Sequence, residues 1–309
     1  MFFSRQRQLP DQTIAGLKKL LFVYRQELSL RHRFLWYNYF MIITKASGEK
    51  VEFSQKKYEE SLHRVGLTIE EAKEISSQIN QDLYPNVPSD RIFLRTHQFL
   101  KKKNKIFAAK YSLKRAIMNL GPAGYFFERY MATVLAAYGY KTRYNQLVEG
   151  KCVEHEVDII AERDGKKYMI ECKYHNQSGR KSDLKVALYT YARFLDLKDK
   201  YQFSQAVLMT NTAFTAEAVK YSRCMGVKVV GWRYPQSGES LEHYIESKKL
   251  YPVTVLTSLT RQLNHRFREE NIVLAVDLLK FTPQSLAKRF KISLGLAQRL
   301  ISEVSVLIS

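Results

Sequence analysis

Two apolar segments joined by Asp164-Gly165 constrain this sequence more than any other feature. The segments, VEHEVDIIAER and KKYMIECKYH, alternate polar and apolar residues in the pattern of half-buried β-strands. Asp-Gly between two such segments is a strong signal for a two-residue type I′ turn. A turn of this type fixes the register of the hairpin, so Arg163 lies opposite Lys166 and each outward step keeps the same sum of residue numbers.

The predicted register brings charged residues together. Asp158 falls opposite Glu171, and Glu156 falls opposite Lys173. Because side chains alternate along a strand, all four are expected on one face of the sheet. The apolar residues between them are expected on the opposite face, toward a core: Val157, Ile159, Ile170 and Cys172. Two carboxylates that face each other repel and destabilise a sheet unless a positive group lies between them.

A divalent cation would relieve this repulsion. Carboxylate oxygens are the hard ligands that Mg²⁺ or Mn²⁺ prefers, and Mg²⁺ keeps open water positions that can carry phosphate oxygens. A lysine beside the metal, here Lys173, can position a water or stabilise charge in the transition state. The hairpin therefore predicts metal-assisted phosphodiester hydrolysis. The alternative is a surface cluster of ion pairs without a catalytic role.

The hairpin pattern resembles that of the PD-(D/E)xK nuclease superfamily, and more narrowly that of Mrr-type restriction endonucleases. The pattern is D-x12-E-C-K, preceded by a helix that carries FFE, and the resemblance covers roughly residues 121–232. It implies Asp158 and Glu171 as metal ligands, Lys173 as the catalytic lysine, and Glu128 as the acid that completes the metal shell. A valine stands where the superfamily has a proline before the aspartate.

The segments around the hairpin predict the fold of this core. A helix is expected over 125–138 and a strand over 141–148, both before the hairpin. After it come a helix with Ser182 as N-cap, a strand SQAVLMTN, a helix with Thr215 as N-cap, and a strand VKVVGW. Strands that follow crossover helices lie parallel. The order therefore predicts an α/β (α+β) core of the αβββαβ type, with a mixed sheet covered by helices on both faces.

The charge of the chain indicates a polyanionic partner. Fifty Lys and Arg against thirty Asp and Glu give a net charge of +20 at pH 7, and a field of this sign concentrates phosphates and releases their counterions on binding. The polar segment YHNQSGRKSD after the hairpin leads into a helix. Three cations there are predicted to bind DNA phosphates: Arg180, Lys181 and Lys185. The alternative is an exposed basic loop.

Cysteine usage and hydropathy predict a cytoplasmic protein. The chain has three cysteines and no CxxC spacing, which fits neither a disulfide framework nor a zinc site and favours a reducing compartment. The first residues, MFFSRQRQLPDQTIAG, lack the apolar core of a signal peptide. No apolar run approaches the roughly 18 residues of a membrane span, so a membrane partner is not expected.

Changes of texture along the chain predict four parts. The clearest punctuation is LGPAG at 120–124, and the helical stretch before it, 91–120, carries nine Lys and Arg and no acid. Near the end, SLAKRFKISLGLAQRLISEV has the outline of a helix-turn-helix or helix-hairpin-helix that can bind DNA, or of a small helical core. The predicted parts are a basic helical segment (1–40), a mostly helical domain (41–120), the nuclease domain (121–240) and a small helical domain (241–309).

The second part resembles an ATP-cone, the small nucleotide-binding module of ribonucleotide reductases and their repressor. The resemblance rests on ITKASGEKVEFSQKKYEESL and covers roughly residues 41–116. It implies ATP or dATP as an effector, with Lys45 and Lys57 near its phosphates. Ala46 stands where the family has arginine. The alternative is a degenerate cone kept as a DNA-binding or dimerisation scaffold.

The combined prediction is a Mg²⁺-dependent DNA endonuclease that acts in restriction or defence against foreign DNA and responds to a nucleotide. Cleavage of both strands of a duplex needs two active sites, so a homodimer or higher homo-oligomer is expected by analogy. One alternative is a nucleotide-responsive DNA-binding regulator whose nuclease core is inactive. Another is a structure-specific nuclease of repair or junction resolution with the same catalytic residues.

Overall fold

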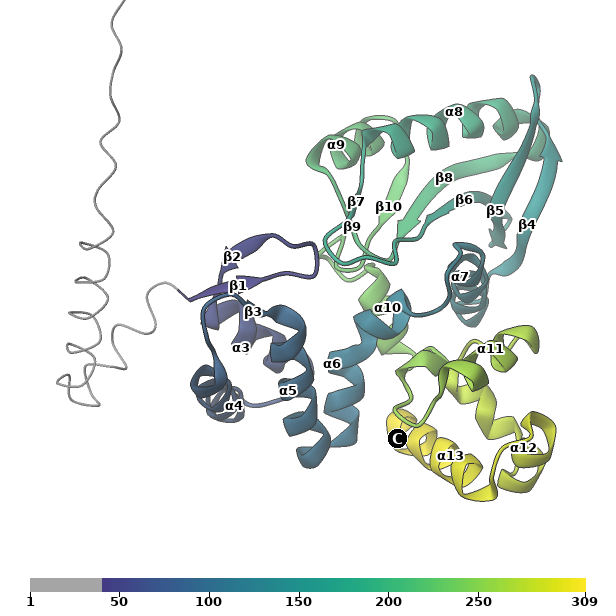
Figure 1. Ribbon diagram of the computed structural model, residues 1–309. Helices are drawn as coiled ribbons and strands as arrows, with labels where there is room; N and C mark the ends of the chain where they lie inside the picture. Colours follow the sequence, from purple (N-terminus) through teal and green to yellow (C-terminus); the bar gives the residue numbers. More distant parts are fainter. Residues whose placement is uncertain (1–40) are drawn as a thin grey trace, which may run out of the picture.

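The computed structural model describes residues 41–309, so the helical segment predicted over 1–40 lies outside the described residues. Figure 1 shows an N-terminal unit, a unit built on a large sheet, and a C-terminal group of helices. The three meet around helices α6 (Lys105–Met118) and α10 (Leu241–Ser247). Within 41–309 no helix has the length and apolar character needed to cross a membrane.

The N-terminal unit is a small sheet packed on helices. Its strands have the order β2-β1-β3, with β1 antiparallel to β2 and parallel to β3. Helix α4 begins with a capping box, in which Thr68 and Glu71 each bond the other's backbone N–H. The elements are β1 (Ile42–Thr44), β2 (Lys50–Glu52), α3 (Gln55–Arg64), α4 (Ile69–Asp82), β3 (Val87–Pro88) and α5 (Ser89–Lys103).

The larger sheet has five strands in the order β10-β8-β6-β5-β4. Strands β4, β5 and β6 are antiparallel, whereas β8 and β10 lie parallel to β6 and to each other, which confirms the predicted mixed sheet. The elements of this unit are α7 (Tyr125–Ala137), β4 (Lys141–Glu149), β5 (Glu154–Arg163), β6 (Lys166–Lys173), α8 (Leu184–Tyr201), β8 (Phe203–Thr210), α9 (Ala216–Cys224) and β10 (Lys228–Val230).

The hairpin between β5 and β6 has the predicted turn and register. Asp164 and Gly165 have φ of 53° and 72°, the positive values that a type I′ turn requires at both central residues. Pairing runs from Arg163 opposite Lys166 to Ile159 opposite Ile170, at a constant sum of residue numbers. The prediction from the turn residues is therefore confirmed along this part of the hairpin.

A pair of short strands changes the predicted start of α8. Strand β7 (Lys181–Ser182) pairs with β9 (Ala213–Phe214), and neither was predicted. Because Ser182 belongs to this strand, the predicted cap at Ser182 is wrong. Asp183 is the N-cap, and its side chain accepts a hydrogen bond from the N–H of Val186. The predicted cap of α9 at Thr215 is confirmed.

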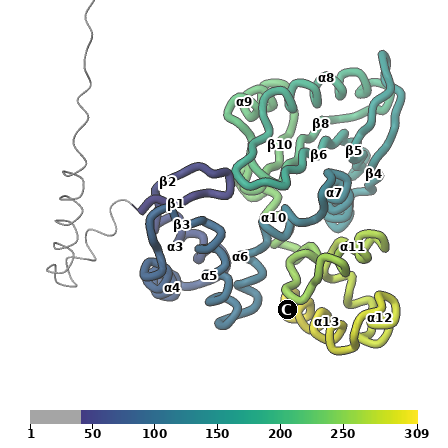
Figure 2. Tube along the Cα trace, viewed as in Figure 1, coloured from purple at the N-terminus to yellow at the C-terminus, as the bar shows by residue number. Residues whose placement is uncertain are grey.

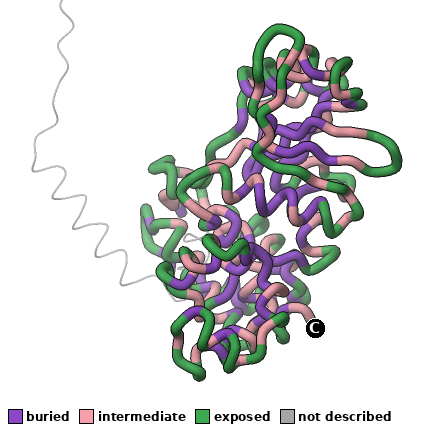
Figure 3. Tube along the Cα trace, turned by 90° about the vertical axis from the view of Figure 1, so that its right-hand side faces the viewer, coloured by how far each residue is buried: buried purple, intermediate pink, exposed green. Residues whose placement is uncertain are grey.

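The large sheet is buried on both faces. On one face Ile159 and Ile170 pack with Phe127 of α7 in a cluster that continues into the C-terminal helices. On the other face Ile160 and Met169 pack beneath α8 and α9. Figure 3 shows buried segments running through the strands, with exposed loops projecting from them. The C-terminal elements are η1 (Val253–Val255), α11 (Arg261–Glu269), η2 (Ala275–Lys280), α12 (Pro283–Phe290) and α13 (Leu294–Ile308).

Candidate active site

The candidate site lies where strands β5 and β6 stop pairing. Asn145 of β4, between the pairs Tyr144–Ile159 and Gln146–Val157, has a left-handed φ of 52°. At this point the alternation of β5 breaks, because Val157 packs in the cluster beneath α8 whereas Ile159 packs against the α7 side. The prediction that Val157 shares a face with Ile159 is wrong for this reason.

Asp158 and Glu171 come together at the break. The N–H of Cys172 donates to Oδ2 of Asp158 at 2.7 Å, which holds the carboxylate over the end of β6. Burial raises the pKa of Asp158, and repulsion by the Glu171 carboxylate adds to the shift. Two carboxyl groups that share a partly buried space hold protons more tightly than they do in water. An added positive charge would relieve this repulsion.

Glu171 is buried and has two partners on α8. Its carboxylate forms an ion pair with Arg193 and accepts a hydrogen bond from the Tyr189 hydroxyl at 3.1 Å. Burial raises the pKa of Glu171, although Arg193 opposes the shift. Arg193 and Tyr189 lie one helical turn apart, so both reach the same carboxylate. They orient Glu171 toward the side of the sheet that α8 covers.

Glu128 lies in the first turn of α7 and is half-buried. Burial, followed by the charges of Glu156 and Glu171, raises its pKa to about 7. Glu156 therefore lies toward α7 and Glu128. The expectation that it shares a face with Lys173 is wrong, because the break at Asp158 turns this part of β5 around.

Lys173 is half-buried at the end of β6. Its positive charge opposes the rise that burial causes in the pKa of Glu171. The hydroxyl of the next residue, Tyr174, donates to the carbonyl of Met118, which ties the end of β6 to α6. The structure thus brings together four predicted residues, one from each of α7 and β5 and two from β6: Glu128, Asp158, Glu171 and Lys173.

Three residues of the site were not predicted. The sequence does show that Tyr189 and Arg193 lie on one face of a helix, since residues four apart on a helix share a face. The face of α8 that meets the sheet was not readable from the sequence. The third residue is Asn211, whose fully buried side chain accepts a hydrogen bond from the N–H of His175 at 2.8 Å and donates one to its carbonyl at 2.7 Å.

Replacing Asn211 with alanine should destabilise the protein and displace the segment after Lys173. The partly buried N–H and carbonyl of His175 would lose their partner, at a cost of about 1–3 kcal/mol. Urea unfolding of the variant should show a lower midpoint with an unchanged slope. Gln236→Ala, an exposed loop residue, is the matched control. An unchanged midpoint for Asn211→Ala would mean that the two hydrogen bonds between Asn211 and His175 do not stabilise the fold.

The other predicted binding residues lie outside this cluster. Arg180, Lys181 and Lys185 are exposed on the segment that leads into α8. Lys45 and Lys57 are exposed in the N-terminal unit, and Lys45 pairs with Glu49 at 2.9 Å. The two groups are neighbours through their loops (Figure 2), since a Cβ added at Gly179 would lie 3.8 Å from the Cβ of Ser47.

Comparison with known proteins identifies the relatives of the chain. Residues 122–232 match the family described as restriction endonuclease, and residues 251–308 match the family described as AF1548-like, C-terminal. An uncharacterized protein of Archaeoglobus fulgidus is 52% identical over 126 residues, which are 41% of this chain and 71% of that protein. This chain belongs to the AF1548-like family. Its residues 122–232 form a restriction-endonuclease domain of the PD-(D/E)xK type.

Solved structures include one member of the same family. The crystal structure of AF1548, a protein of unknown function, has 39% sequence identity and a TM-score of 0.53. The match covers 60% of the present AF1548-like chain and 98% of that one. A repair endonuclease from Pyrococcus abyssi has 20% identity over 32% of this chain and 43% of its own, with a TM-score of 0.26. That similarity is too low to carry an argument.

The donor set of the AF1548-like site fits Mg²⁺. Within residues 41–309, no three His, Cys, Asp or Glu side chains are arranged to hold a metal ion. Mg²⁺ is usually bound through only one or two carboxylates, with water and substrate phosphates as its other ligands. Asp158 and Glu171 supply two such carboxylates. Burial raises the pKa of both carboxyl groups, and the charge of Glu171 adds to the shift at Asp158, so a cation between them would favour the ionised forms.

The metal-free protein should lose stability as the pH rises through the neutral range. Folding raises the pKa of Glu128 from 4.5 to about 7, so the folded state favours the protonated carboxyl. The stability from this group is fully present below about pH 4.5 and is lost as the pH rises toward 7. Melting temperatures in EDTA, measured from pH 5 to 8.5, should fall less steeply for Glu128→Gln than for the wild type. Parallel curves would contradict the shift.

Proposed function

We propose that this AF1548-like protein hydrolyses phosphodiester bonds of DNA with Mg²⁺ or Mn²⁺ held by Asp158 and Glu171. The observation that carries the proposal is the pair of partly and fully buried carboxyl groups, from neighbouring strands, beside Lys173. The restriction-endonuclease family match over the same residues supports a nuclease. Glu128 of α7 would reach the metal through a bound water, because no three His, Cys, Asp or Glu side chains within 41–309 are arranged to hold the ion directly.

Each residue of the site has a separate role in this proposal. The bound metal supplies Lewis-acid stabilisation of the charge that develops on the phosphate. Asp158 and Glu171 fix its position, because Cys172 and Arg193 hold their carboxylates in place. Lys173 donates a hydrogen bond to the attacking water or to a phosphate oxygen, and its positive charge favours the transition state.

The DNA duplex would be held by exposed cations beside the site. Arg180 and Lys181 lie on the segment between Lys173 and α8, and Lys185 lies in the first turn of α8, where side chains can contact phosphates on either side of the scissile bond. The C-terminal helices α12 and α13 are a second candidate contact. The net charge of +20 gives such contacts a strong dependence on salt. A homodimer would supply the second active site for double-strand cleavage.

A nucleotide effector in the N-terminal unit is a further proposal. The observation that favours it is the contact between the β1–β2 turn and the loop after Lys173, at Ser47 and Gly179. ATP or dATP bound near Lys45 and Lys57 would act on the active site through this contact. The Lys45–Glu49 pair would then open to release the ammonium group for phosphate.

The test of the proposed function is cleavage of three DNA substrates with Mg²⁺ or EDTA: supercoiled plasmid, phage DNA and a branched oligonucleotide. Cutting of plasmid and phage DNA with Mg²⁺ alone supports a restriction or defence nuclease, and a change on adding ATP supports the effector. Preference for the branched substrate supports a repair or junction nuclease. Binding without any cutting would overturn the nuclease proposal and favour a DNA-binding regulator.

A further inference from the structure

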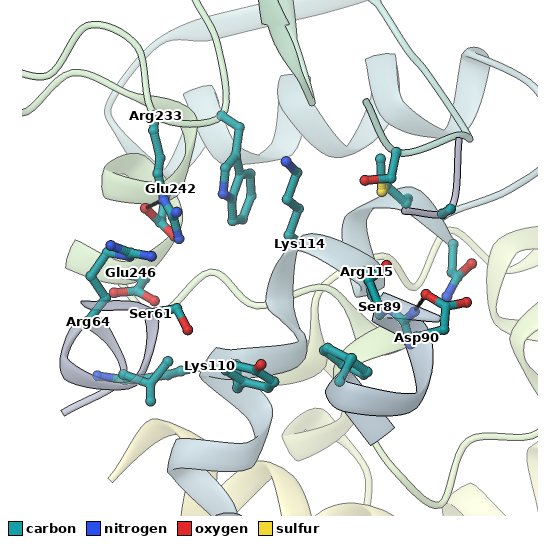
Figure 4. A pocket seen from close by; sticks show the side chains of 18 of the residues that line it. Ser61, Arg64, Ser89, Asp90, Lys110, Lys114, Arg115, Arg233, Glu242 and Glu246 are labelled. Atoms are coloured by element: carbon teal, nitrogen blue, oxygen red, sulfur yellow. Dashed lines mark hydrogen bonds and ion pairs between the residues drawn. The ribbon is translucent and has the colours of Figure 1, made fainter. Parts of the chain in front are cut away.

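Two clefts beside the active site form one groove. The first has a volume of about 550 Å³ and lies between the N-terminal unit and the sheet unit (Figure 4). The second, of about 520 Å³, lies between α11 and the segment that joins α6 to α7. Met118, Asn119 and Asn176 line both clefts. The two volumes therefore meet at the end of α6.

The groove is strongly positive. Its cations are Arg64, Lys110, Lys114, Arg115, Arg233, Arg261 and Arg268. Its acids, all in the first cleft, are Asp90, Glu242 and Glu246. Ion pairs with Arg115 and Arg233 already neutralise Asp90 and Glu242.

Two cations of the first cleft, Lys114 and Arg64, form no ion pair within residues 41–309, although the charge of Glu242 acts on both. Lys114 extends from α6 into the open space of the cleft (Figure 4). Burial and the charge of Arg233 lower the pKa values of both Lys114 and Arg64. A phosphate group in the open space of this cleft would be attracted to these two cations.

Buried polar atoms in the groove lack partners. Trp232 is 4% exposed, lines the first cleft, and its indole N–H has no hydrogen-bond partner among the described residues. In the second cleft the same holds, within 41–309, for Oδ1 of Asn264 and the Nε–H of Arg268. Buried polar groups without partners are costly. A polar ligand in the groove would provide their missing hydrogen bonds.

Aromatic rings also line the first cleft. Phe93 stacks on Tyr111 with ring centroids 5.2 Å apart, and the Arg115 guanidinium lies 3.8 Å above the Phe93 ring. Proteins that bind single-stranded nucleic acid combine a positive groove with aromatic side chains on which bases stack. The first cleft has the positive charge and an aromatic wall, in which Tyr111 and Arg115 cover the Phe93 ring.

We propose that this groove holds a single strand of the DNA substrate and leads it to the active site. The inference rests on the proposed nuclease function and adds a substrate class, DNA with a single-stranded arm.

The position of the groove favours a substrate strand over a compact nucleotide. Two clefts in line accommodate an extended chain. Asn176, in the wall they share, follows Lys173 by three residues in the sequence. Gly121, in the wall of the second cleft, precedes α7 and Glu128. The walls of the groove are therefore continuous in the chain with the segments that carry Lys173 and Glu128.

The test is binding of labelled DNA to the full chain in EDTA, followed by fluorescence anisotropy. One probe is a forked duplex with single-stranded arms, and the other is a blunt duplex of the same paired sequence. Lys114→Ala and, separately, Arg261→Ala should weaken binding of the forked probe by about fivefold or more and reduce its salt dependence. Lys102→Ala, an exposed cation of α5 outside the groove, should leave both affinities unchanged.

Three results would overturn the groove assignment: equal affinity of the wild type for both probes, equal weakening of both probes by Lys114→Ala, or displacement of the forked probe by ATP alone. The last would assign the first cleft to a compact nucleotide. Thermal melting of both variants verifies that they fold. Because binding is measured without metal, failure here leaves the proposed hydrolysis standing, and that proposal fails separately if Mg²⁺ produces no cutting.

Discussion

Replacing Lys173 with alanine should lower the rate of Mg²⁺-dependent DNA cleavage by about 10²- to 10³-fold, the usual cost of losing one group that stabilises transition-state charge. Lys173 is half-buried at the end of β6, and its ammonium group acts on the Glu171 carboxylate. Alanine removes that charge from the site without disturbing the strand pairing of β6. Single-turnover cleavage of a plasmid, with enzyme in excess, measures the chemical step directly.

The control for this experiment is Lys185→Ala. Lys185 is exposed in the first turn of α8, so its loss should weaken DNA binding by a few-fold and leave the single-turnover rate at saturating enzyme unchanged. DNA binding by Lys173→Ala should remain close to that of the wild type. A variant that cuts at the wild-type rate would remove Lys173 from the catalytic group.

Replacing Asp158 with asparagine should abolish cleavage and at the same time stabilise the metal-free protein. The amide keeps an oxygen for the N–H of Cys172 and ends the repulsion with the Glu171 carboxylate. The gain is on the order of 1 kcal/mol, equivalent to about 2–4 °C in the melting temperature of a domain of this size. Differential scanning calorimetry in EDTA at pH 8 measures it.

Adding Mg²⁺ should also change the stability of the wild type and of Asp158→Asn by different amounts. The wild type should gain stability when Mg²⁺ is added, because binding to the folded state shifts the unfolding equilibrium, whereas Asp158→Asn should gain much less. Asp199→Asn, an exposed acid on α8, should match the wild type in both assays. A variant at 158 that melts earlier than the wild type in EDTA would mean that the carboxylate is a structural group.

Local chemistry explains what the sequence could predict. The turn at Asp164-Gly165 depends only on its own residues and strand pattern, and it set the register from Arg163–Lys166 to Ile159–Ile170 correctly. The parallel direction of the last strands followed from the alternation of helices and strands. Glu128 came from the resemblance of the FFE helix to that of the nuclease superfamily, and it stays a prediction.

Long-range packing explains what the sequence could not predict. The break at Asp158 lies opposite Asn145 on strand β4, which has a left-handed backbone conformation. Counting alternate residues along one strand cannot predict the conformation of a residue on the neighbouring strand. Arg193 reaches Glu171 because α8 lies across the sheet at one particular rotation. Ser182 was a reasonable cap by composition, but pairing between β7 and β9 extends the strand to that residue.

The position of α6 has a practical consequence for dissecting the protein. Ala108 near its start belongs to the hydrophobic cluster of the N-terminal unit, whereas Leu113, Ala116 and Ile117 belong to the cluster that contains α7 and the C-terminal helices. The Thr254 hydroxyl also donates to the carbonyl of Ala116. A recombinant fragment that starts at 121 would expose to water the apolar surface that α6 covers, and we expect it to aggregate. Dissection of this chain should therefore keep α6 attached to the catalytic half and divide it no later than Asn104.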